Sequence, residues 1–204
     1  MNTEITANIT HLRTIELPND TEHMEGDTLS FLLKDGEPIE AMAVKQESDG
    51  TIYITVDCLA KEYALQKDGD FVNGYEGSDL RKNLNGKILK RFPKKLRKMM
   101  VPFNNGDLLR IPTEREIFGE NNWSEEEPES AEQFKPMKLL ENRIAGKGHN
   151  GIPQWYWLQN RNISWERHGL NYNAVFIGSL GCAGTWDPSD PLCIRLLFKI
   201  RNEQ

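Results

Sequence analysis

Hydrophobic and polar residues alternate along the first third of the chain in a pattern typical of β-strands. Every second residue is apolar over 29–33 and again over 39–43, and residues 51–56 are rich in β-branched side chains. Turn sequences at 35–36 and 48–50 separate these runs. The pattern therefore predicts a three-stranded antiparallel meander.

Helical spacing begins at Ser78, a residue type that accepts hydrogen bonds from the free amides of a first helical turn. Leu80, Leu84 and Ile88 then recur every four residues and define one apolar side. Pro93 ends this helix and can open another, because proline fits the first turn and has no amide to donate. We expect two consecutive helices here.

Two shorter helices are predicted on either side of this pair. Asp57 can cap a helix that runs through Tyr63. Thr113 and Glu116 have the spacing of a capping box, in which each side chain bonds the other residue's amide, and Gly119 is a suitable stop.

The last fifty residues are rich in aromatic and alternating positions. They predict strands at 155–158, 172–177 and 193–200, with glycine and Asp-Pro turns over 178–191. A further strand is expected at 108–111. The expected fold class is therefore α+β, with small antiparallel sheets flanked by two or three helices.

Length and composition set the domain organisation. The chain has 204 residues, which suits a polar N-terminal arm at 1–27 followed by a single domain at 28–204. The net charge of −6 argues against a wholly basic nucleic-acid coat. We expect no membrane insertion, because no apolar run reaches the ~20 residues of a span. The polar first residues lack a secretion signal, so we expect a protein that is cytoplasmic as synthesised.

Four segments, in order, resemble an uncharacterised domain family of gut Gram-positive bacteria and their prophages. Tyr75–Asn85 is similar to the family's Y-x-x-S-x-L-R-x-x-L-N helix, and Asp107–Gly119 to its F-L-P-S-x-x-E-x-F-G turn and helix. Trp155–Leu158 is similar to its W-W-L-R-S strand, and Cys193–Ile200 to its closing G-V-R-P-A-F-x-I strand. The resemblance covers roughly residues 28–200.

The C-terminal half of that family looks related to C-type-lectin-like domains. Sulfatase-modifying-factor domains and the variable proteins of diversity-generating retroelements share its layout. Here 174–178 matches the middle strand and Arg195 the closing strand. The chain departs from the family at Gln159-Asn160, at Cys193 and at Leu196. The resemblance implies a C-type-lectin-like fold and a non-catalytic, prophage-linked binding module.

Candidate binding residues lie on the loops that such a fold uses for recognition. Trp165 and Trp186 fall in predicted loops, and Asp187 and Asp190 follow in an Asp-Pro turn, with Arg195 on the sheet beneath. The partner would be a cell-surface glycan or protein. A phage component could be part of the virion and would reach the outside of the cell through lysis. Two carboxylates do not supply the six to eight oxygens of calcium, so we expect no metal or cofactor.

Trp155 and Trp157 point to the same side of their strand, with Tyr156 on the other, which favours packing. A stacking platform for a sugar ring or peptide is the alternative. A rival class is a sulfatase-modifying type of enzyme, which would need a reactive Cys182 or Cys193.

The most unusual charge feature is a basic stretch over 81–98, with nine Lys or Arg residues and no acid. One interpretation is a solvated helical face balanced by the acidic loop at 125–132. The other is docking onto a polyanion, whether nucleic acid, an anionic cell-wall polymer or an acidic partner, with nucleic acid not the favoured partner. Without a groove-reading motif, such binding would be blind to sequence and sensitive to salt. The polyanion-binding candidates are Arg81, Lys90, Arg91, Lys94, Lys95 and Lys98.

Overall fold

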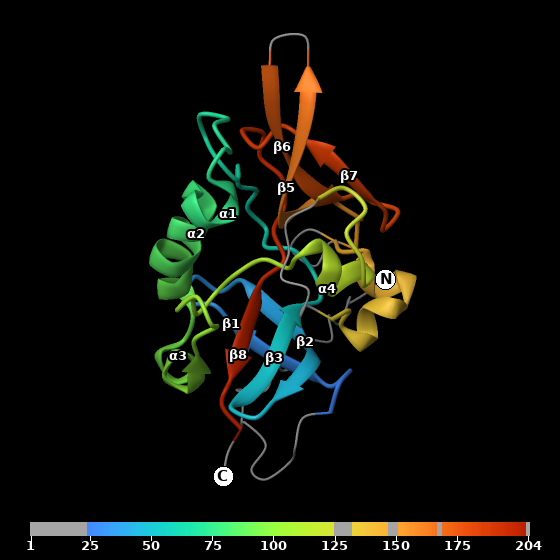
Figure 1. The fold of residues 1–204 in the computed structure, drawn as a ribbon. Helices are drawn as coiled ribbons and strands as arrows, with labels where there is room; N and C mark the ends of the chain where they lie inside the picture. Colours follow the sequence, from blue (N-terminus) through green and yellow to red (C-terminus); the bar gives the residue numbers. More distant parts are fainter. Residues whose placement is uncertain (1–23, 125–131, 147–150, 167–168, 203–204) are drawn as a thin grey trace, which may run out of the picture.

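Two antiparallel sheets with short helices along their sides make up the protein (Figure 1). The computed structural model describes residues 24–124, 132–146, 151–166 and 169–202. Most of the predicted N-terminal arm, residues 1–23, lies outside these ranges. The mixture of helix and antiparallel sheet confirms the α+β class. The elements are β1 (Thr28–Leu32), β2 (Pro38–Glu47), β3 (Gly50–Thr55), α1 (Gly74–Gly77), α2 (Asp79–Asn83), the π-turn η1 (Leu84–Ile88), the 3₁₀ turn η2 (Leu89–Arg91), α3 (Lys94–Met99), β4 (Met100–Val101), α4 (Glu114–Phe118), the 3₁₀ turns η3 (Lys135–Lys138) and η4 (Leu140–Arg143), β5 (Tyr156–Glu166), β6 (Gly169–Ile177), β7 (Ala183–Trp186) and β8 (Leu197–Ile200).

The predicted meander is present as β1, β2 and β3 and forms one side of a five-stranded sheet. The strand order is β1-β2-β3-β8-β4, so the end of the chain inserts next to the meander. Leu29 pairs with Ala41, and Met42 with Ile54. Gly36 has a φ of 87° in the first turn, a conformation that favours glycine.

The centre of this sheet is buried on both faces, whereas the edge strand β1 is exposed on one. Tyr53 of β3 faces a core that α2 and α3 cover, where it stacks on Phe198 with ring centroids 5.7 Å apart. Its neighbours Ile52 and Ile54 face a second core, together with Met137 of η3. Because both faces are covered, every residue of β3 is buried rather than every second one.

Ser78 and Thr113 cap helices at the positions where the sequence predicted helix starts. The Ser78 hydroxyl accepts a hydrogen bond from the Arg81 amide at 3.1 Å, and the chain then passes from α2 into η1. Thr113 and Glu116 form the complete capping box of α4, which ends at Gly119 with a φ of 84°. Pro93 occupies the N-cap position directly before α3, without a capping hydrogen bond from its side chain.

The helix predicted from Asp57 to Tyr63 was wrong. The Asp57 carboxylate instead accepts a hydrogen bond from the Gly146 amide at 2.8 Å, and Tyr63 forms a bridge with Leu192. These long-range bonds replace the local ones that a helix would need. The strand predicted at 108–111 is reduced to one bridge, between Arg110 and Leu197.

The second sheet has the order β5-β6-β7 and stands beyond the first, with the β5–β6 hairpin extending outward (Figure 1). Strand β7 lies within the 178–191 region that was predicted to hold only turns. Strand β8 begins at Leu197 rather than at Cys193. Trp157 and Tyr156 face opposite cores, as the alternation predicted.

Candidate functional site

Three aromatic rings gather at the start of β5 and along β6 and β7. Trp155 stacks on Phe176, with ring centroids 4.7 Å apart and planes inclined by 23°, and meets Trp186 edge-on at 5.6 Å. Offset-stacked and edge-on arrangements are those that aromatic pairs prefer. Trp155 is 39% exposed and Trp186 43% exposed, so both indoles reach the surface. We call Trp155, Phe176 and Trp186 the aromatic face.

The strand register explains how the three rings meet. Phe176 of β6 pairs with Gly184 of β7, and Ala174 pairs with Trp186. A Cβ atom on Gly184 would lie 3.0 Å from a Phe176 ring carbon, so the glycine leaves the space that this ring occupies. Alternation along the strands then puts Trp186 on the same face of the sheet as Phe176.

The Trp186 indole is fixed by the turn that follows it. Its Nε1–H donates to the Asp190 carboxylate at 2.7 Å. The Asp187 carboxylate accepts from the amide and the hydroxyl of Ser189, at 2.8 and 2.7 Å. The two predicted aspartates therefore lie in one turn that is stabilised by its own hydrogen bonds. Asp190 orients the exposed Trp186 indole.

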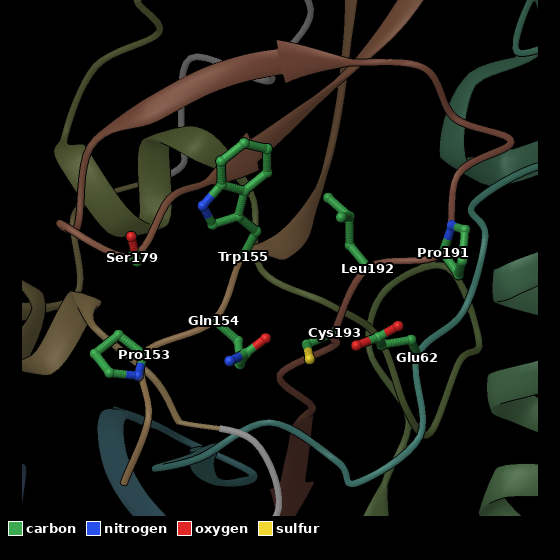
Figure 2. A pocket seen from close by; sticks show the side chains of 8 residues that line it. All are labelled: Glu62, Pro153, Gln154, Trp155, Ser179, Pro191, Leu192 and Cys193. Carbon is green, nitrogen blue, oxygen red and sulfur yellow. The ribbon is translucent and has the colours of Figure 1, made fainter.

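A cavity of about 300 Å³ opens beside the aromatic face, at the lower end of the usual range for ligand pockets. Figure 2 shows the Trp155 ring at one side and the Gln154 amide and Glu62 carboxylate projecting toward the centre. The cavity thus combines an aromatic surface with groups that can bond hydroxyls or amines. Its lining residues are Glu62, Pro153, Gln154, Trp155, Ser179, Pro191, Leu192 and Cys193.

Backbone hydrogen bonds join the walls of this cavity. The Cys193 amide donates to the Trp155 carbonyl at 3.1 Å, and the Trp157 amide donates to the Cys193 carbonyl at 3.2 Å. On the other side, Tyr63 and Leu192 exchange amide-to-carbonyl bonds of 2.8 and 3.2 Å. The segments that carry Glu62 and Trp155 are therefore both bonded to the segment Leu192–Cys193.

Arg195, which was predicted as a binding residue on the sheet beneath the loops, lies in the core just before β8. It is 1% exposed. Its Nε–H donates to the Thr55 carbonyl at 2.8 Å, and its Nη1 donates to the Asn142 carbonyl at 2.7 Å. These bonds tie β3 to the segment η4.

The prediction that Trp186 lies in a loop was wrong, because this residue ends β7 and pairs with Ala174. The same prediction was wrong for Trp165, which belongs to β5 and pairs with Leu170. Its side chain is outside the described part of the structure. For Trp155, packing was favoured over a stacking platform; the ring packs on Phe176 and is also partly exposed. Glu62 and Gln154 were also missed, since they reach the cavity from segments far apart in the sequence. The Pro153-Gln154-Trp155 run before a strand was the available signal.

The three cysteines differ sharply in accessibility. Cys182 is exposed, whereas Cys58 and Cys193 are buried, and all three are free thiols. Burial raises the pKa of Cys58 well above its usual value, and hydrogen bonding to the Cys193 side chain adds to this. The buried Cys58 thiol is therefore protonated at neutral pH. Within the ranges that the structure describes, no group of three His, Cys, Asp or Glu side chains is arranged to hold a metal ion.

The candidates for polyanion binding separate into two kinds. Arg81 pairs with Asp107 at 2.7 Å and with Glu76 at 2.6 Å, so its charge is neutralised locally. Arg91 is likewise paired with Asp35 and Glu37. The other four are exposed, namely Lys90, Lys94, Lys95 and Lys98.

Comparisons with family models, with curated proteins and with solved structures found no match. The family resemblance and the C-type-lectin-like fold stay predictions from the four sequence motifs. Among the described residues, no helix has the length and apolar character needed to cross a bilayer.

Proposed function

We propose that the protein is a non-catalytic binding module that takes a cell-surface glycan on the aromatic face and in the adjoining cavity. The observation that carries this proposal is the pair of exposed indoles, Trp155 and Trp186, which pack against each other and against Phe176. Fixed, exposed aromatic rings lose little entropy on binding and present flat apolar area.

The cavity supplies the polar contacts that a glycan requires. A sugar ring has an apolar face, which fits an indole, and a rim of hydroxyl groups. The Glu62 carboxylate accepts hydrogen bonds, and the Gln154 amide both donates and accepts. Both line the cavity next to Trp155. The prophage-linked resemblance adds a biological setting in which surface recognition is useful.

A surface protein is a second candidate ligand, and one observation favours it. Leu180, on the turn between β6 and β7, is 77% exposed, and the adjacent Ser179 lines the cavity. Exposed apolar side chains next to tryptophans are typical of the centres of protein interfaces.

The test is retention of the purified protein on cell-wall polysaccharide from a Gram-positive gut bacterium, at low and high salt. We expect Trp155→Ala and Trp186→Ala to lose retention about tenfold or more, because stacking contacts dominate such sites. Trp123→Ala is the matched control, since Trp123 is 44% exposed on the loop after α4 and does not line the cavity. Retention that survives high salt supports the proposal.

Three outcomes would redirect the assignment. Loss in the Trp123→Ala variant equal to that in Trp155→Ala would show a non-specific apolar effect. Retention on protease-sensitive wall material alone would favour the protein ligand. Loss of retention on adding a calcium chelator would favour a calcium site at Asp187 and Asp190.

A further inference from the structure

A second surface, separate from the aromatic face, is built by the helical segment from α2 to α3. Apolar side chains recur every four residues and are all buried, as Leu80, Leu84, Ile88, Phe92 and Leu96. The intervening lysines are exposed on the outer side. We call this set the basic face: Lys82, Lys87, Lys90, Lys94, Lys95 and Lys98.

The lysines of the basic face make no close ion pair in the described part of the chain, although Lys82 interacts electrostatically with Asp68. None of its six lysines forms an ion pair with a described residue, whereas Arg81 and Arg91 are both paired with acids beside them. Of the predicted acidic loop at 125–132, only Glu132 is among the described residues, and it precedes η3. The residues of η3 pack on the opposite face of the five-stranded sheet from those of α2 and α3.

The surroundings of the lysines favour a polyanion over a protein partner. No large hydrophobic side chain is exposed between residues 81 and 98, all of which the structure describes. Protein interfaces usually have an apolar centre, but contacts with a phosphate backbone need only cations. Double-stranded nucleic acid carries one charge per ~1.7 Å of its axis, a density that suits closely spaced lysines.

We propose that the basic face docks on the phosphate backbone of double-stranded nucleic acid without reading its sequence. The lysines are point charges on long stems, and such contacts position a protein but carry no sequence information. The segment lies along one flank of the molecule, with no other element outside it (Figure 1). This surface is distinct from the glycan site, so either proposal can be contradicted without affecting the other.

Binding of a short, labelled DNA duplex across a series of salt concentrations tests the proposal. If about four phosphates are contacted, log K falls with log salt at a slope near −4. We expect Lys94→Glu/Lys95→Glu to weaken binding about tenfold or more and to make the slope shallower by ~2. Glutamates in the first turn of α3 interact favourably with the positive end of the helix dipole, so this variant should fold.

The matched control is Lys135→Glu/Lys138→Glu, which makes the same charge change on η3. Both of its lysines are exposed. Equal weakening by the two variants would mean that net charge alone governs binding, which overturns the proposal. So would the absence of duplex binding at low salt, or tighter binding of an anionic cell-wall polymer than of the duplex. Weakening by the α3 variant alone, with equal affinity for duplexes of different sequence, supports it.

Discussion

The Nε–H of Arg195 donates a hydrogen bond to the carbonyl oxygen of Thr55 at 2.8 Å, inside the core. The guanidinium also lies 5.4 Å from the centre of the Tyr156 ring and bonds the Asn142 carbonyl. One buried side chain therefore links β3, η4 and β5. This explains why an arginine in the closing segment serves the fold and not the surface.

Replacing this residue, as Arg195→Met, should lower the free energy of unfolding by about 2–4 kcal/mol, because two buried carbonyls lose their donors. The melting temperature should fall by about 5–10 °C. Thermal and urea unfolding measure both. Arg201→Met, at an exposed site, should change stability by less than about 0.5 kcal/mol. Unchanged stability in Arg195→Met together with lost glycan retention would assign the residue to ligand binding instead.

The sequence predicted the elements whose signals are local. Ser78, Thr113 and Gly119 act on residues within one turn, so their roles could be inferred and are confirmed. Asp57 has the same capping chemistry, but its carboxylate is engaged by the Gly146 amide, 89 residues away. A hydrogen-bond partner so far away in the sequence cannot be inferred from the residues around Asp57.

The candidate site could be predicted only in part for the same reason. Trp186, Asp187 and Asp190 were selected together because they share one turn. The cavity needs Glu62 beside Trp155, and this contact exists because residues 62–63 run along Leu192. The exposure of Trp155 likewise depends on where β5 begins relative to β7, which periodicity does not specify.

Replacement of Gly50 and of Gly86 by alanine should change the stability in opposite directions. A Cβ atom on Gly50 would lie 2.4 Å from the Ile200 carbonyl oxygen, so Gly50→Ala must displace β8 and should destabilise by about 1–3 kcal/mol. Gly86, in η1, has open space around the same position, and Gly86→Ala should stabilise by about 0.5–1 kcal/mol. Urea unfolding of both variants is the measurement. Destabilisation by Gly86→Ala would mean that η1 requires glycine.

Thiol labelling tests Cys193, one of the two thiols that the rival sulfatase-modifying type of enzyme could use. The exposure of Cys182 is compatible with either class. The native protein should react quickly at Cys182 alone, because Cys58 and Cys193 are 3% and 1% exposed. The denatured protein should react at all three positions. The Cys182→Ser variant should show no fast reaction. Fast labelling of Cys193 in that variant would reveal a reactive thiol beneath the cavity and favour the enzyme.

Stability should decline at alkaline pH. Burial raises the pKa of Tyr53, with a contribution from Asp27, and burial also raises the pKa of Tyr75. The unfolded tyrosines ionise near pH 10 while the folded ones stay protonated. The stabilising contribution is therefore complete below pH ~10 and is lost as the pH rises above it. Urea unfolding across this range, with Tyr53→Phe as the comparison, should show a weaker decline in the variant. Ionisation of Tyr53 at its ordinary pKa in the folded protein would contradict the prediction.

The hydrogen bond from Trp186 Nε1 to Asp190 should affect recognition more than stability. Asp190→Ala removes the acceptor and lets the exposed indole rotate, so retention on cell-wall polysaccharide should fall several-fold through loss of preorganisation. The free energy of unfolding should change by less than about 1 kcal/mol, because the bond is exposed. Asp190→Asn keeps an accepting oxygen and should retain most of the binding. Binding by Asp190→Ala that equals the parent's, together with lost binding by Trp186→Ala, would contradict this prediction. The indole would then bind without the hydrogen bond to Asp190, and the turn at 187–190 would have only a structural role.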